Sequence, residues 1–136
     1  MLKINIKLKT KLENFRKAFI ALEAIYLKPI TEDRAYIDAT IQRFEFTFEL
    51  AWKFLKEYFA QMGIVLNYPK EVIKEAYAVG TVGIINDEDL WIYMLLDRNM
   101  TSQTYNKKLA DEIYEHIKNY TPEFKRLLSI IDSVTL

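Results

Sequence analysis

The side chains best suited to chemistry in this sequence are gathered in one polar segment, residues 97 to 105. The segment reads Asp97, Arg98, Asn99, Met100, Thr101, Ser102, Gln103, Thr104, Tyr105. The Arg98 guanidinium stays charged and presents its donors in a planar fork, which suits a phosphate or a carboxylate. Asn99, Ser102 and Gln103 add neutral hydrogen-bonding groups. Because hydroxyl side chains compete for the backbone and lower helix propensity, we expect function to keep this segment polar.

The geometry of the segment depends on whether it is helical. On an unbroken helix Arg98, Ser102 and Tyr105 would share a face, whereas Gln103 would point away from it. The four side chains converge only if the helix is distorted or ends here. The sequence predicts such an interruption, because the polar run breaks an otherwise strongly periodic helical pattern.

Two interpretations of Arg98 are open. One is a site for an anionic ligand, and the other is an ion pair inside the protein. Glu45 and Glu49 are the obvious internal partners, since they lie one turn apart in an aromatic-rich stretch where an unpaired buried carboxylate would be costly. Both interpretations hold together if an internal pair orients the guanidinium.

Hydrophobic periodicity predicts long helices before this segment. Apolar residues recur at steps of three and four from Leu8 to Tyr26, and Pro29 marks the end of that helix. A second, longer helix is predicted from Asp33, as N-cap, to Gly63, as the left-handed residue that closes it. Its apolar stripe runs along its whole length, so we expect this helix to organise the fold.

Three further helical stretches complete the pattern. A short helix opens with Pro69 at its first position. The next has Asn86 as N-cap, followed by the acidic residues 87 to 89 at the positive end of the helix dipole. A last stretch begins near Leu109, pauses at Thr121–Pro122 and then resumes.

Length and composition favour a single helical domain. The chain has 136 residues but three glycines and three prolines, which is typical of long helices with short connections. We therefore predict one domain over residues 1–136, an all-α, up-and-down four-helix-type bundle with an additional short helix. Apolar residues off the main stripe of the second helix also predict a homodimer; they are Phe46, Leu50, Phe54 and Tyr58.

Composition also excludes several classes of function. Without cysteine there is no disulfide, thiolate nucleophile or zinc–thiolate site, which agrees with a cytoplasmic location. The net charge is zero, so an anionic ligand must be held by a local patch. Residues 1–22 are rich in lysine, and we interpret them as a solvated helix face rather than a nucleic-acid tract. No apolar run predicts a membrane span or a secretory signal.

Three motifs give the chain a specific family resemblance. They are the aromatic run 42–53, the helix start 69–76 and the polar segment 97–105. Together they resemble the nucleotidyltransferase substrate-binding proteins of the HEPN superfamily. The resemblance implies a homodimeric bundle that binds a minimal nucleotidyltransferase of the DNA polymerase β class. ATP and magnesium are expected in that partner, whereas this chain is expected to have no cofactor or metal of its own.

Ribonuclease members of this superfamily carry an arginine, then a histidine, and often a tyrosine two positions later that the partner modifies with AMP. Arg98 and Tyr105 match this pattern, but Gln103 stands where the histidine is expected. An amide does not transfer protons at neutral pH, so it lacks the acid–base chemistry of metal-free RNA cleavage. His116, the single histidine, is predicted to be a surface residue.

We therefore interpret the chain as a non-catalytic substrate-binding or regulatory subunit in a toxin–antitoxin-like pair. The expected nucleotide-binding residues are Arg98, Asn99, Ser102, Gln103 and Tyr105, with Tyr105 also the modification acceptor. Asp97, Glu45 and Glu49 are expected to support them. Two alternatives stay open. One is a metal-independent endoribonuclease toxin in which Arg98 is catalytic, with RNA as partner, and the other is a purely structural helical dimer.

Overall fold

The computed structural model describes residues 5–26, 34–78 and 84–134, and the described chain is all-α, as predicted. The elements are α1 Ile6–Tyr26, α2 Ala35–Gln61, α3 Pro69–Ala78, α4 Glu88–Asn99, the short 3₁₀ helix η1 Thr101–Gln103, and α5 Lys107–Val134. None of the helices in these ranges combines the length and apolar character that a bilayer crossing requires.

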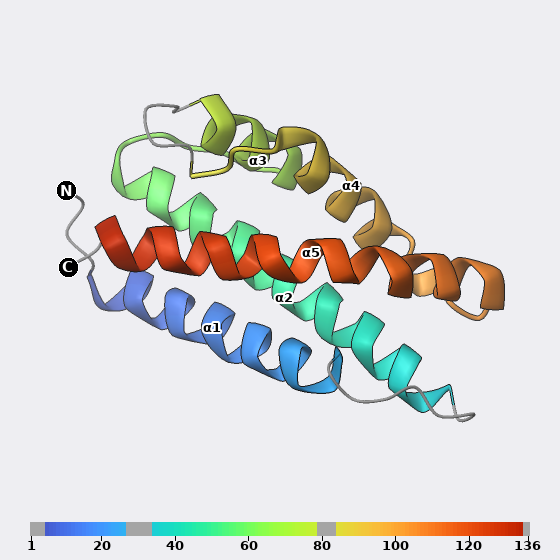
Figure 1. Ribbon diagram of the computed structural model, residues 1–136. Coiled ribbons are helices and arrows are strands. Elements are labelled where there is room, and N and C mark those ends of the chain that lie inside the picture. Colours follow the sequence, from blue (N-terminus) through green and yellow to red (C-terminus); the bar gives the residue numbers. More distant parts are fainter. Residues whose placement is uncertain (1–4, 27–33, 79–83, 135–136) are drawn as a thin grey trace.

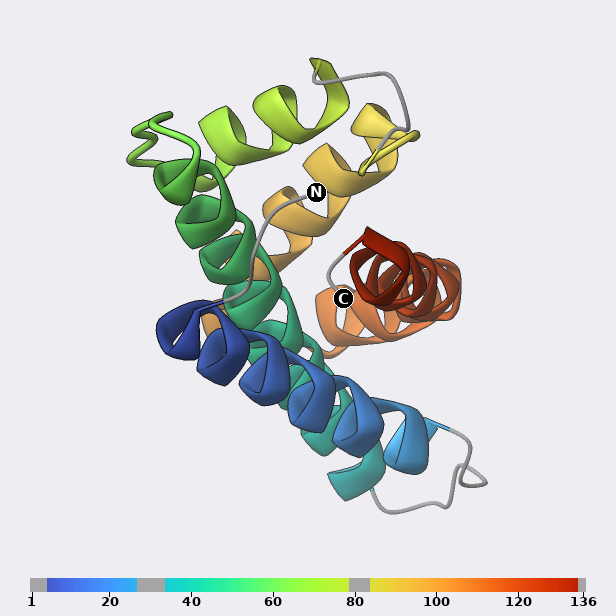
Figure 2. The ribbon, with the colours of Figure 1, turned by 90° about the vertical axis from the view of Figure 1, so that its left-hand side faces the viewer.

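The helices form a bundle around α2. The long helices α1, α2 and α5 pack together, while the shorter α3 and α4 lie on another side of α2 (Figures 1 and 2). Among the described elements α2 contacts every other helix, including η1. This confirms that the longest apolar stripe organises the fold. The contact with η1 also places the interruption between α4 and α5 against the side of α2, and we call this interruption, together with the last residue of α4, the break (residues 99–106).

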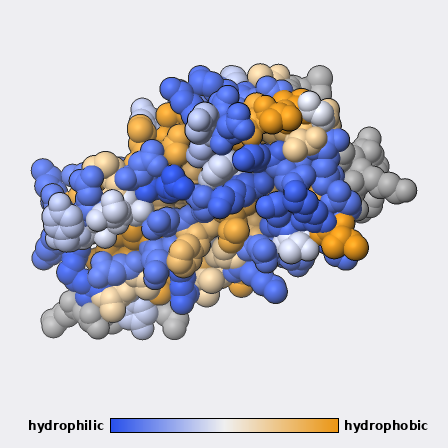
Figure 3. All heavy atoms as spheres, turned by 180° about the vertical axis from the view of Figure 1, so that it is seen from behind, coloured by the Kyte–Doolittle hydropathy of each residue, from blue (hydrophilic) through white to orange (hydrophobic). Residues whose placement is uncertain are grey.

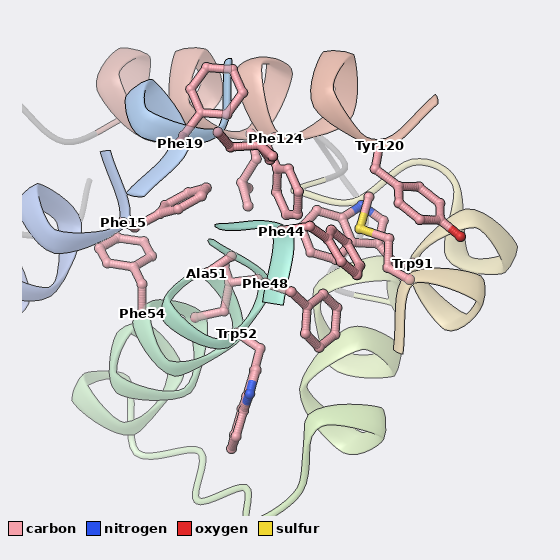
Figure 4. Close-up of a cluster of buried hydrophobic side chains, with 14 of the residues drawn as sticks. Phe15, Phe19, Phe44, Phe48, Ala51, Trp52, Phe54, Trp91, Tyr120 and Phe124 are labelled. Carbon is pink, nitrogen blue, oxygen red and sulfur yellow. The ribbon is translucent and has the colours of Figure 1, made fainter. Parts of the chain in front are cut away.

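Aromatic rings fill the centre of the bundle. Phe44 of α2 stacks on Tyr120 of α5 with the ring centroids 5.3 Å apart, and Trp91 of α4 meets Phe124 edge to face at 5.7 Å. Figure 4 shows these rings converging from three helices. Aromatic pairs of this kind contribute beyond their buried area, so α4 is fixed firmly to α2 and α5.

The predicted ends of α1 and α2 are partly confirmed. α1 ends at Tyr26, while the predicted boundary residues Pro29 and Asp33 lie outside the described residues. The prediction for Gly63 is confirmed, because its φ is +82°. Its N–H donates to the Ala60 carbonyl at 3.0 Å, which closes α2 with the left-handed turn that glycine adopts at little cost.

Two predicted boundaries are wrong. The N-cap of α4 is Asp87 rather than Asn86, because the Asp87 carboxylate accepts the Leu90 N–H at 3.0 Å and its charge suits the helix N-terminus. The pause at Thr121–Pro122 is also absent, since α5 runs through Pro122 without ending. Tyr120 and Phe124 are buried on either side of the proline, and this anchoring outweighs the lost backbone hydrogen bond.

Most of the apolar residues off the main stripe of α2 pack inside the bundle instead of forming an outer face. Phe54 is fully buried and lies beside Phe15 of α1, so it belongs to the core rather than to an outer face (Figure 4). Leu50 and Tyr58 are half-buried, whereas Phe46 is 53% exposed. α2 is thus apolar on two sides because two layers of the bundle pack on it, and of these four residues Phe46 alone is exposed.

Candidate functional site

The predicted interruption after α4 is present, and threonine hydroxyls help to shape it. The Thr101 hydroxyl donates to the Arg98 carbonyl at 2.8 Å, and that of Thr104 donates to the Thr101 carbonyl at 3.1 Å. The Gln103 N–H donates to the Met100 carbonyl at 3.0 Å, which gives the tight 3₁₀ turn of η1. Hydroxyls therefore bond to the backbone in place of a continuing helix, as their chemistry predicts.

Arg98 is held at the base of this segment by Glu49 of α2. One terminal guanidinium nitrogen forms an ion pair with Glu49 Oε2, and the other donates to Asn99 Oδ1 at 3.1 Å. Trp52 Nε1 donates to the same Glu49 oxygen at 3.1 Å, and Lys53 Nζ lies 3.3 Å from the other. The predicted internal pair thus exists, and Glu49 rather than Glu45 forms it.

The electrostatics of Glu49 follow from these contacts. Burial raises the pKa of the Glu49 carboxyl, but the hydrogen bonds from Trp52, Lys53 and Arg98, together with the Arg98 charge, outweigh it and lower that pKa overall. Glu49 is therefore ionised at neutral pH and keeps the guanidinium oriented. The unused N–H groups of Arg98 are donors suited to an anion.

The rest of the predicted nucleotide-binding residues lie at the surface of the break. Asn99, Ser102 and Gln103 are exposed, and Tyr105 has 88% of its surface exposed. Within the described chain, no hydrogen bond joins Arg98 to Ser102, Gln103 or Tyr105. The last turn of α4 brings Arg98 together with Asn99 and Glu49, whereas Ser102, Gln103 and Tyr105 beyond it point outward and do not converge on Arg98.

Glu45 lies apart from the ion pair. It lines a hollow of about 510 Å³ between α2 and the break, together with Thr101 and Thr104. Its predicted supporting role is therefore not that of a partner to Arg98.

Asp97 faces a different helix from its neighbour Arg98. Its Oδ2 accepts the Tyr120 hydroxyl at 2.5 Å and lies 2.8 Å from His116 Nδ1, both on α5. Burial, followed by the hydrogen bond to Asp97 and the charge of that carboxylate, raises the pKa of the Tyr120 phenol, so Tyr120 remains a donor. Figure 4 shows the Tyr120 hydroxyl directed away from the aromatic core.

Sequence reasoning missed the contact between His116 and Asp97. The prediction that His116 is a surface residue is correct, since half of its side chain is exposed, but the imidazole is oriented by a carboxylate. The available signal was the four-residue spacing of His116 and Tyr120, which puts both on one face of a helix. They line a cavity of about 360 Å³ between α4 and α5; the other lining residues are Leu90, Tyr93, Leu96, Asp97 and Asn119.

The arrangement offers three kinds of chemistry. Arg98 can bind an anion, the exposed Tyr105 phenol can accept a group, and the Asp97–His116 pair has the form of an oriented proton-transfer group. In the described part of the chain, no three histidine, aspartate or glutamate side chains gather as a metal site.

The fold and the break define a class of protein: an all-α bundle with an anchored arginine below an exposed polar segment. Residues 10–133 match the family described as "nucleotidyltransferase substrate binding protein like", so the chain belongs to that family. A Haemophilus influenzae protein named "probable ribonuclease HepT" is 31% identical over 107 residues, which cover 75% of this chain and 71% of that protein.

Two solved structures share the fold. A Thermus thermophilus protein is 32% identical with a TM-score of 0.78, and the match covers 86% of this chain and 98% of that one. A Haemophilus influenzae protein is 25% identical with a TM-score of 0.67, covering 92% and 96%. Its structure is described as revealing the fold of a substrate binding domain of a nucleotidyltransferase. These likenesses confirm the family resemblance drawn from the sequence.

Proposed function

We propose that this chain is a non-catalytic substrate-binding or regulatory subunit. It docks a minimal nucleotidyltransferase and presents residues 98–105 to the partner's active site. The family description and the Haemophilus structure support the nucleotidyltransferase as partner. The observation that carries the proposal is an 88% exposed Tyr105 a few residues beyond an arginine fixed by Glu49.

Each part of the segment has a role in this proposal. Arg98 holds a phosphate group with the N–H donors that Glu49 does not use, and Asn99, Ser102 and Gln103 hydrogen-bond the rest of the nucleotide. The Tyr105 oxygen attacks the α-phosphorus of ATP in the partner's site. An oxygen–phosphorus bond forms, pyrophosphate leaves, and the phenol proton passes to a base of the partner. Magnesium and ATP belong to the partner, and Gln103 leaves this chain without the usual proton-transfer residue.

Co-expression with a minimal nucleotidyltransferase tests the proposal. We expect the two proteins to co-purify, and after incubation with ATP and Mg²⁺ we expect mass spectrometry to find one AMP on the peptide that contains Tyr105. Tyr105→Phe should abolish the adduct. Tyr68→Phe, which alters another well-exposed tyrosine, should leave it unchanged. Failure to form a complex, or an adduct that survives Tyr105→Phe, would contradict the proposal. Sedimentation of the chain alone tests the predicted homodimer.

A second candidate function is a metal-independent endoribonuclease. It is supported by the name of the Haemophilus relative and by the 2.8 Å contact between His116 Nδ1 and the Asp97 carboxylate. In this function Arg98 would bind the scissile phosphate, with His116 as the one imidazole available. RNA cleavage by the chain alone in EDTA, lost in Arg98→Ala and in His116→Gln, would select this function over a non-catalytic subunit.

A further inference from the structure

A groove lined by lysines lies between the first turns of α1 and the last turns of α2. Its volume is about 350 Å³, and its lining residues are Lys7, Lys11, Trp52, Lys53, Lys56, Glu57 and Ala60. Four lysines therefore face one glutamate in a chain whose net charge is zero. From sequence alone the N-terminal lysines are interpreted as a solvated face. The fold adds that two of them lie opposite two lysines of α2.

The groove is continuous with the anchor of Arg98. Glu49, Lys53, Lys56 and Ala60 follow one another at steps of four, three and four, so they share one face of α2. At a rise of 1.5 Å per residue, this face extends for roughly 16 Å from the Arg98 contact to the far end of the groove. We call this face with the groove the lysine strip.

Cations outnumber carboxylates on the lysine strip. Glu57 is held by Lys7 at 2.7 Å, and hydrogen bonding from Lys7 lowers the pKa of the Glu57 carboxyl. Glu49 is shared between Lys53 and Arg98. With Lys11 and Lys56 added, the strip holds four lysines and Arg98, which are five cations, against the two carboxylates of Glu49 and Glu57. An excess of positive charge concentrated on one face of a neutral protein attracts an extended anion.

The residues that line the groove favour a polynucleotide over a protein as the anion that the strip attracts. Trp52 and Ala60 are the apolar members of the groove lining, so the groove lacks the apolar centre typical of a protein interface. Lys56 Nζ lies 5.9 Å from the ring centroid of Trp52, but that indole is buried with 7% of its surface exposed, so the groove offers cations rather than a stacking ring. A positively charged groove that follows the backbone is the part of a single-stranded nucleic-acid site that these lysines supply. Seen from behind, the surface of the molecule is mainly hydrophilic, with several apolar patches among the hydrophilic side chains (Figure 3).

We propose that the lysine strip binds the phosphate backbone of a single-stranded polynucleotide and leads it toward Arg98. This inference goes beyond nucleotidyltransferase docking and does not depend on it. Lys11 and Lys56 contact phosphates directly, while Lys53 and Arg98 continue the path past Glu49. The chemistry recognised is the phosphate backbone, which RNA and DNA share.

Fluorescence anisotropy of the full chain with labelled single-stranded RNA and DNA of equal length tests the proposal. For single strands, log K falls with log salt by about 0.7 per phosphate contact, so two contacts are worth roughly 25-fold at 0.1 M salt. We expect Lys11→Gln with Lys56→Gln to weaken binding by about that factor and to reduce the salt slope by about 1.4. The matched control is Lys70→Gln with Lys125→Gln, two exposed lysines on α3 and α5, which should change neither quantity.

The outcomes separate the sources of the anion. Binding of both polymers supports recognition of the backbone alone, and binding of RNA but not DNA supports a strip that also senses the 2′-hydroxyl. Absence of binding at low salt, or equal weakening by the control pair, overturns the proposal. It is also overturned if the Lys11 and Lys56 changes abolish co-purification of the nucleotidyltransferase but leave polynucleotide affinity intact, since the strip would then be a protein contact. Thermal unfolding of each variant verifies that it is folded.

Discussion

Replacing Glu49 by glutamine tests how the arginine is anchored. The Glu49 carboxylate accepts from Trp52 Nε1 at 3.1 Å, lies 3.3 Å from Lys53 Nζ and pairs with Arg98. Glutamine keeps one acceptor oxygen, which can take the Oε2 position and accept from Trp52 and Arg98, but its amide N–H groups then oppose Lys53 Nζ. The variant therefore loses the ion pair and gains an unfavourable donor–donor contact.

The magnitude follows from the exposure of the pair. A hydrogen bond to a charged group is worth about 1.5–3 kcal/mol when buried. Side-chain exposures of 26% for Glu49 and 28% for Arg98 allow solvent to screen the pair, so we expect the low end of that range, about 1.5 kcal/mol. For a chain of this length that loss lowers Tm by roughly 5 °C. Urea unfolding at pH 7 measures it directly.

The same variant has a predicted pH dependence. The pKa of Glu49 is lower in the folded chain than its ordinary value of 4.5. The contribution of the carboxylate is thus complete above that value and is lost as pH falls through the lower folded value. The stability difference between wild type and Glu49→Gln should therefore shrink below about pH 4.5. Equal stability at pH 7, or a difference that is the same at pH 7 and pH 3, would refute the reasoning. Glu115→Gln, at an exposed ion pair, should change stability by less than about 0.5 kcal/mol.

Three other predictions concern α5. Arg126→Met should lower the free energy of unfolding in urea by about 3 kcal/mol, because the buried Glu123 carboxylate would keep only the Trp91 indole of its present donors. A decrease below about 1 kcal/mol would contradict this. Tyr120→Phe removes the donor to the Asp97 carboxylate and should cost about 2 kcal/mol, measured as a Tm roughly 7 °C lower; an unchanged Tm would speak against that hydrogen bond. Pro122→Ala restores a backbone donor inside α5 and should raise stability by about 1 kcal/mol, so a lower Tm would be the contrary result.

The fold could be predicted from the sequence to the extent that apolar periodicity determines it. The stripe of α2, the glycine at its end and the interruption after α4 all depend on local chemistry, and all three are present. The predicted pause of the helix at Pro122 is wrong, because a local rule for proline does not include the burial of Tyr120 and Phe124 on either side of it. Burial of this kind is a property of the assembled bundle.

The candidate site was predictable in composition but not in its contacts. Charge and burial costs identified a glutamate partner for Arg98, yet choosing Glu49 over Glu45 needs the rotation of α2 relative to α4. The contact between Asp97 and His116 joins residues nineteen positions apart on different helices, and no local pattern specifies it. The lysine groove likewise depends on α1 and α2 being brought side by side.

Neighbouring residues at the end of α4 are fastened to different helices. Arg98 is held by Glu49 of α2, and Asp97 by Tyr120 of α5. Consecutive side chains on a helix are separated by about 100° around its axis, so the ion pair and the hydrogen bond hold α4 from two directions. Rotation of α4 about its own axis would break at least one of these two contacts. The orientation of the segment that follows α4, with Tyr105 exposed near its end, is therefore set by the packing of both α2 and α5.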